Sequence, residues 1–269
     1  MKLTSIFIGL LMLGMLWGGC KPDPPIDEEG LVNLEIQPTL NGADFALNTD
    51  FQNPADRRTQ IERLFLYVSD VYLVPDSGEE ILLTDPETES PALLFKFGAT
   101  LTDAGHEATS RTFTVPAGEY RGLKLSLGVP ENLNNQDPAI YSNAHALSIT
   151  NGTHWSWNNG YIFLMLDGSI DSSPTKDGAS LDLGLTYHCG TNALRKDLVY
   201  LDLEDAFQVQ TEGSTTLSFG LEVNKLFTAP GDSIDMTLEN FTHTAGAGVD
   251  LATRIMNNLS QEAFEKKPF

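Results

Sequence analysis

The chain has 269 residues, with 16 lysines and arginines against 37 aspartates and glutamates, and its formal net charge is −21. This acidic balance argues against a nucleic-acid partner, because too few cations are present to neutralise phosphates. It favours cations as partners or, more simply, solubility. The only cysteines are Cys20 and Cys189, so a lipid on the first would leave the second without an intrachain disulfide partner.

The N-terminal segment predicts export and a lipid anchor. Residues 1–19 combine an early lysine with an apolar stretch too short to cross a bilayer, which is typical of a signal peptide. Two glycines then precede Cys20, an order that resembles a bacterial lipobox, in which the cysteine is lipidated and becomes the mature N-terminus. Residues 20–30 are rich in proline and acids and are expected to form a flexible tether. The alternative is ordinary secretion with cleavage nearby.

Residues 31–269 are expected to form one domain, in which apolar residues recur with a period of two. Alternating, half-buried strands of an antiparallel sheet are predicted at 32–37, 122–128, 181–187 and 216–224, with further strands at 64–68, 71–74, 80–84, 92–97, 111–115, 161–166, 198–203 and 234–238. Helical spacing occurs near the end, within 249–264. The pattern therefore predicts an all-β antiparallel sandwich, Greek-key, immunoglobulin-like or barrel-like, with long loops and one C-terminal helix.

Two of the three tryptophans lie close together in the segment THWSWNNGYIF. If the strand at 161–166 extends backwards, Trp155 and Trp157 point to one side of it, and His154 and Ser156 to the other. The indole pair would then form a broad, flat wall. That wall suits three roles, which the spacing alone leaves open: a cap on the core, a platform that stacks a sugar ring, or part of a reactive or metal-binding site.

His188 and Cys189 form a second candidate group at the end of the strand 181–187. The alternation turns His188 away from the apolar face of that strand. Imidazole is the commonest transition-metal ligand and thiolate binds soft ions such as Cu(I). Adjacent strand residues point in opposite directions, so both could serve one ion only if the strand ended there, which Gly190 would permit. His106, His145 and His243 lie in polar contexts where a solvated imidazole is expected.

Familiar catalytic motifs are missing from the sequence. It contains no HExxH, paired CxxC, glycine-rich phosphate loop or G-x-S-x-G elbow. We therefore expect a binding protein and not an enzyme, with a monomer as the default state.

Several stretches together resemble the MbnP-like copper-binding protein family. They are HWSWNNGYIFLMLDG, LTYHCGTNALRK, LSFGLEVNKLF and DLATRIMNNLSQEAF, in the family's order, preceded by IERLFLYVSDVYL and FTVPAGEYRGLKLSLGV. The resemblance covers roughly Val32 to Phe264. It implies a secreted or lipid-anchored bacterial β-sandwich protein of the cell envelope, at the outer membrane and facing either the periplasm or the surface.

The resemblance also implies a mononuclear copper site. Trp155 or Trp157 would be oxidised to kynurenine by a partner di-haem enzyme of the MauG-like class, and His188 would be the main histidine ligand. His154 is the expected second ligand, with His243 as the fallback. Cys189 is expected to be a small buried filler, the alternative being a soft ligand.

Two other functions compete with copper binding. One is a carbohydrate-binding β-sandwich lipoprotein of a glycan-uptake system, in which the two tryptophans stack sugars. The other is a structural or assembly lipoprotein whose tryptophans only pack.

Overall fold

The computed structural model describes residues 28–97, 109–157, 160–178 and 180–268. The expected signal peptide, Cys20, His106 and the pair Asn158 and Asn159 lie outside the described residues. Of the expected tether, only its last three residues are described, and two of them already belong to the first strand. Within the described ranges, no helix combines the length and apolarity needed to span a membrane.

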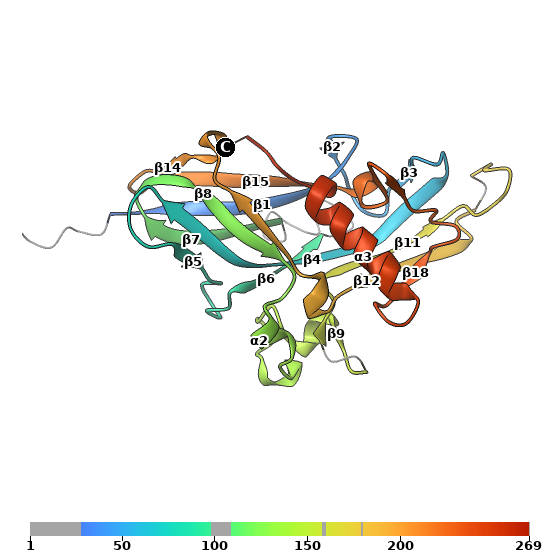
Figure 1. The fold of residues 1–269 in the computed structure, drawn as a ribbon, viewed down its shortest axis with the longest axis horizontal. Coiled ribbons are helices and arrows are strands. Elements are labelled where there is room, and N and C mark those ends of the chain that lie inside the picture. Colours follow the sequence, from blue (N-terminus) through green and yellow to red (C-terminus); the bar gives the residue numbers. More distant parts are fainter. Residues whose placement is uncertain (1–27, 98–108, 158–159, 179, 269) are drawn as a thin grey trace, which may run out of the picture.

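Two β-sheets make up the body of the molecule (Figure 1). The first contains β1 (Glu29–Leu40), β2 (Ala43–Asp44), β7 (Ser110–Pro116), β15 (Ser214–Glu222) and β19 (Phe264–Lys266). The second contains β3 (Asp50–Gln52), β4 (Arg58–Pro75), β5 (Ile81–Leu83), β6 (Ala92–Phe97), β8 (Gly118–Leu127), β11 (Leu164–Ile170), β12 (Leu183–Cys189), β13 (Lys196–Tyr200), β14 (Phe207–Val209) and β18 (Phe241–Thr242). Separate two-stranded ribbons are β9 (His154–Trp155) with β10 (Gly160–Tyr161), and β16 (Thr228–Ala229) with β17 (Asp232–Ser233).

In the part of the chain that the structure describes, the helices are few and short. They are α2 (Glu131–Asn134), α3 (Gly248–Asn258), a π-helical turn (Leu259–Ala263) and the 3₁₀ turns Pro138–Ile140, Ile149–Asn151, Asn192–Leu194, Leu203–Asp205 and Val223–Leu226. α3 buries Leu251 and Ile255 and packs against β12 and β18. The all-β sandwich-like fold with one C-terminal helix is thus confirmed.

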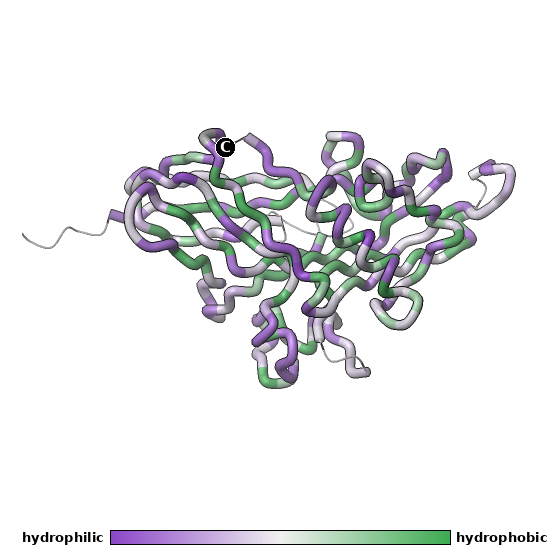
Figure 2. The backbone as a smooth tube through the Cα atoms, in the orientation of Figure 1, coloured by the Kyte–Doolittle hydropathy of each residue, from purple (hydrophilic) through white to green (hydrophobic). Residues whose placement is uncertain are grey.

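The core lies between the apolar faces of the sheets. In β1 the predicted alternation is followed closely, because Val32, Leu34 and Ile36 are fully buried while the residues between them are partly exposed. Figure 2 shows hydrophobic residues concentrated along the central strands and hydrophilic residues in many of the loops between them. Apolar burial on this scale is the main stabilising contribution to such a fold.

Among the described strands, two pairs differ from the expected antiparallel arrangement. β1 and β15 pair in parallel, from Leu31 opposite Ser214 to Thr39 opposite Glu222. β12 and β18 also pair in parallel. Alternation reports which face of a strand is buried but not the direction of its neighbour, so the sequence pattern could not distinguish these cases.

The strands predicted at 64–68 and 71–74 are one continuous strand, β4, which runs through the centre of the second sheet. The residues between them, Ser69 and Asp70, form an irregularity where the pairing register with β8 shifts. Asp70 has a φ of 49°, a left-handed conformation that aspartate tolerates better than most residues. The polar pair therefore marks a bulge and not a turn.

One further predicted strand was wrong, and another is interrupted. Residues 234–238 form a turn, in which the Asp235 carboxylate accepts hydrogen bonds from the backbone N–H and the hydroxyl of Thr237. Such a local bond competes with strand pairing. The segment 161–166 is divided, because β10 ends at Tyr161 and β11 begins at Leu164.

The long polar segment between Pro130 and Thr153 packs beneath the β9–β10 ribbon. Tyr67 donates a hydrogen bond to the carbonyl of Ala146, and Tyr161 donates one to the carbonyl of Leu147. The buried Asn134 at the end of α2 accepts a bond from the backbone N–H of Tyr161 at 2.8 Å. α2 and β9 consequently project together from one side of the body (Figure 1).

Candidate metal centre

One part of the candidate centre is a row of side chains on the outer face of β4, β11 and β12. Asp167 lies opposite Arg63 of β4, and Met165 lies opposite His188 of β12. His188 and Asp167 are therefore diagonal neighbours on one face of the sheet, within reach of each other. The His188 Nε2 is 3.0 Å from the Asp167 Oδ1, and the Arg63 Nε is 3.2 Å from the Asp167 Oδ2.

Trp155 forms the wall behind this row. Its side chain is 5% exposed and packs with Ile162 and Met165 in a small apolar cluster separate from the main core, with Phe65 at its edge. Its indole Nε1 is buried and has no hydrogen-bond partner among the described residues. A buried N–H without a hydrogen-bond partner is energetically unfavourable. Such a group in a native structure calls for an explanation, and a functional role is one.

Gly190 permits the close approach of Trp155 to the end of β12. A Cβ at this position would lie 2.2 Å from the carbonyl oxygen of Tyr161 and 3.1 Å from the indole ring of Trp155. Only a glycine fits between these two groups.

Trp157 lies at the mouth of the site. Its side chain is 57% exposed, and its ring centroid is 5.6 Å from that of Trp155, with the planes tilted by 45°. The two indoles do not share one pleated strand as expected, since Trp155 ends β9 and Trp157 follows it in the turn toward β10. The hairpin nevertheless brings the rings together.

His243 completes the cluster from a distant part of the chain. Its ring centroid is 4.8 Å from that of His188, with nearly parallel planes, and 6.0 Å from that of Trp157. The Thr244 hydroxyl donates to the carbonyl of His188 and accepts from the N–H of Gly190, which fixes this segment to β12. Burial, and secondly the neighbouring His188, lower the pKa of His243.

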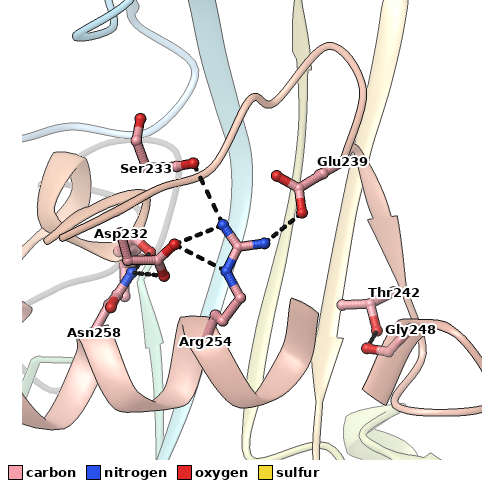
Figure 3. Close-up of polar contacts among 8 residues, drawn as sticks. Asp232, Ser233, Glu239, Thr242, Gly248, Arg254 and Asn258 are labelled. Carbon is pink, nitrogen blue, oxygen red and sulfur yellow. Dashed lines mark hydrogen bonds and ion pairs between the residues drawn. The ribbon is translucent and has the colours of Figure 1, made fainter. Parts of the chain in front are cut away.

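α3 holds the segment that leads to His243. Arg254 donates hydrogen bonds from Nε and Nη2 to the Asp232 carboxylate and also contacts Glu239, at the two ends of that segment (Figure 3). The pKa of Asp232 is lowered mainly by its hydrogen bonds from Arg254. The Thr242 hydroxyl donates to the carbonyl of Gly248 at 2.6 Å, which joins β18 to the start of α3.

The structure does not bring His154 into this cluster. His154 precedes Trp155 on β9 and so points the other way, where its ring meets that of Tyr161 edge-on with centroids 4.9 Å apart. The histidine beside His188 is His243, which was expected only as the fallback for the second ligand. Cys189 is fully buried in the main core, where burial raises the pKa of its thiol.

An open cleft of about 570 Å³ adjoins the cluster. Its lining includes Trp157, Phe241 and His243 with the acidic residues Glu239 and Asp250. Phe241 is 58% exposed, and its ring centroid is 4.6 Å from that of His243. The mouth of the site is therefore aromatic with an acidic rim.

Sequence reasoning missed Asp167 and Arg63. A usable signal was present for the first, because Asp167 directly follows the apolar run YIFLML. A carboxylate at the end of such a run calls for a cationic or hydrogen-bonding partner.

The comparisons with known proteins concern the family and the fold. The model of the MbnP family matches residues 29–247. The chain belongs to the MbnP family. Among solved structures, MbnP from Methylosinus trichosporium has a similar fold, with a TM-score of 0.57 and 16% sequence identity, covering 84% of this chain and 87% of that one. At this identity the likeness concerns the fold alone. No curated protein sequence matches the chain.

The region matched to the MbnP family contains the whole cluster. It extends from β1 past His243 and stops just before α3. The family resemblance inferred from the sequence is confirmed.

Proposed function

We propose that this MbnP-family protein binds copper through His188 and His243 together with an oxidised Trp155. In this proposal it acts as a binding protein, not an enzyme, anchored by lipid in the bacterial cell envelope. The observation that supports it is the convergence of side chains from β9, from β12 and from the segment after β18 at one pocket mouth. Copper, when bound, supplies a redox-active cation that imidazole nitrogens ligate well.

The two histidines are a suitable but incomplete ligand set. Among the described residues no group of three His, Cys, Asp or Glu side chains could hold a metal ion. In this proposal a donor of another kind completes the set. The rings of His188 and His243 are stacked with nearly parallel planes. Because each nitrogen lone pair lies in the plane of its own ring, the two lone pairs cannot meet at one ion until one ring rotates. His243, which is partly exposed, has the freer ring.

Trp155 is the better candidate for the missing donor. An intact indole N–H can only donate a hydrogen bond, whereas kynurenine carries an amine and a carbonyl that can bind a metal. The Nε1 of Trp155 is buried without a partner in the described part of the chain, while Trp157 is largely exposed to water. We propose that a di-haem enzyme of the MauG-like class carries out this oxidation.

The test combines mass and metal content. Protein produced beside a di-haem partner should show the small mass change of a tryptophan converted to kynurenine, which loses one carbon and gains one oxygen, and peptide mapping should place the change at residue 155. Copper titration should then show a large loss of affinity for His188→Ala and His243→Ala. His154→Ala is the matched control, because His154 lies next to Trp155 in sequence but faces away from the cluster. Equal affinity in all four proteins would overturn the proposed site.

One observation favours a second function, carbohydrate binding. Trp157 and Phe241 are both more than half exposed beside an open cleft, as in sites that stack sugar rings. Trp155, which is buried, could not serve in this way. Under this alternative, Trp157→Ala would lose glycan retention while the copper content stayed unchanged. Under the copper proposal, His188→Ala would leave any glycan retention intact.

A further inference from the structure

A polar chain crosses three strands behind the proposed copper ligands. It runs from Arg63 on β4 through Asp167 on β11 to His188 on β12. The side chain of Asp167 is only 20% exposed, and that of His188 only 15%. A carboxylate placed this deep is costly unless it is paired, so its two contacts account for its presence.

The contacts of Asp167 determine where the proton of His188 resides. An ionised carboxylate can only accept hydrogen bonds. At 3.0 Å from the Asp167 Oδ1, the Nε2 of a neutral His188 must therefore carry the hydrogen and donate it. The lone pair is then on Nδ1. Carboxylates that bind the far nitrogen of a metal-ligating histidine orient its ring in this way.

Arg63 has the complementary role of holding the carboxylate. Its Nε is 3.2 Å from the Asp167 Oδ2, an oxygen that is buried and has no aligned hydrogen bond among the described residues. The contact is thus an ion pair and not a directed bond. It keeps the second oxygen occupied and leaves the first for His188.

We propose that Asp167 is a positioning residue, which fixes His188 with its proton on Nε2 so that Nδ1 is the metal-binding nitrogen, and that Arg63 holds Asp167 for this task. The role in metal binding rests on the proposed copper function. The placement of the proton does not, since it follows from contacts within the protein.

The substitution Asp167→Asn separates positioning from packing, because the amide has the same shape. With Arg63 on one side, the amide oxygen will face the guanidinium and the amide NH₂ will face His188. The imidazole must then accept at Nε2 and carry its proton on Nδ1, which removes the lone pair that the metal needs. An Asp→Asn change beside a catalytic histidine selects the wrong tautomer for the same reason.

The experiment measures the tautomer of His188 and the copper affinity of the protein separately. Nitrogen-15 NMR of the metal-free protein should show His188 protonated at Nε2 in the wild type and at Nδ1 in Asp167→Asn. Copper affinity should fall about 10- to 100-fold in Asp167→Asn and less in Arg63→Gln. The control is Asp50→Asn, which removes a comparable ion pair, with Arg58, from the exposed part of the same sheet. Circular dichroism checks that every variant is folded.

The two possible failures are distinguishable. A wild-type His188 protonated at Nδ1, or an Asp167→Asn variant with unchanged tautomer and affinity, would overturn the role of Asp167. Wild-type protein that carries kynurenine and still retains no copper would instead overturn the proposed function, and with it the metal-presenting part of this inference.

Discussion

The two faces of β12 differ in burial, in polarity and in the presence of a charged neighbour. Toward the core the strand presents Leu185, Tyr187 and Cys189, each at most 1% exposed. Toward the outside it presents Thr186 and His188, and the latter meets a carboxylate on the next strand. Cys189 is thus adjacent to the proposed ligand in sequence and separated from it by the thickness of the sheet. Proximity along a strand does not create a site; sharing a face does.

The largest expected effect lies where β12 ends. Gly190→Ala places a Cβ 2.2 Å from a backbone oxygen, which cannot move without displacing the β10 region, so we expect a loss of about 3 kcal/mol or more in unfolding free energy. Gly184→Ala is the control on the same strand, because a Cβ there meets nothing within 4 Å. Its free energy of unfolding should lie within about 0.5 kcal/mol of the wild-type value or be slightly higher. Equal denaturation midpoints for the two variants would contradict this account.

Substituting the neighbours His188 and Cys189 tests the comparison directly. His188→Ala should lose most copper affinity, more than about 100-fold, and should lower the stability by about 1 kcal/mol or less, since Asp167 keeps its contact with Arg63. Cys189→Ala should instead leave copper affinity unchanged and lower the stability by about 1 kcal/mol through a small cavity. Copper titration and chemical denaturation measure the two effects. Weakened copper binding in Cys189→Ala would mean that the thiol does act as a ligand.

The parts of the fold that follow a periodic pattern could be predicted from the sequence. Alternation located β1, β8, β12 and β15, and the helical spacing located α3, because each of these has one buried face. The direction of neighbouring strands and the continuity of β4 could not be predicted from the sequence, since both depend on pairing with strands that are distant in the chain. The turn at residues 234–238 was missed because its hydrogen bonds to Asp235 are local and override an apolar pattern.

The site was predictable only in part, for a similar reason. The orientation of His188 followed from alternation within its own strand. The resemblance put His154 before His243 as the second ligand. The parallel pairing of β18 with β12, which the sequence pattern does not report, brings His243 beside His188. Asp167 becomes visible as a partner only once β11 and β12 are placed in register.

A smaller effect concerns the hydroxyl groups of two buried tyrosines. The Oη of Tyr187 has no hydrogen-bond partner among the described residues, so Tyr187→Phe should be neutral or slightly stabilising. Tyr161→Phe is the matched comparison, because its Oη donates to the carbonyl of Leu147 at 2.7 Å, and it should cost about 1 kcal/mol. Thermal unfolding measures both. A larger loss for Tyr187→Phe than for Tyr161→Phe would show that the inner face of β12 contains a polar contact of its own.

A last expected effect is the response of the inner face of β12 to alkaline pH. Burial raises the pKa of the Cys189 thiol, so the folded protein keeps the thiol protonated while the unfolded chain ionises near the ordinary value of about 8.5. A folded pKa above the unfolded one contributes stability below the unfolded pKa and loses it as the pH rises beyond that value. The wild type should therefore lose more stability than Cys189→Ala between about pH 8.5 and 10. Thiol reagents should label Cys189 only after unfolding, since the thiolate is the reactive form. Rapid labelling of the folded protein at neutral pH would place the thiol at an accessible surface and erase the difference between the two faces.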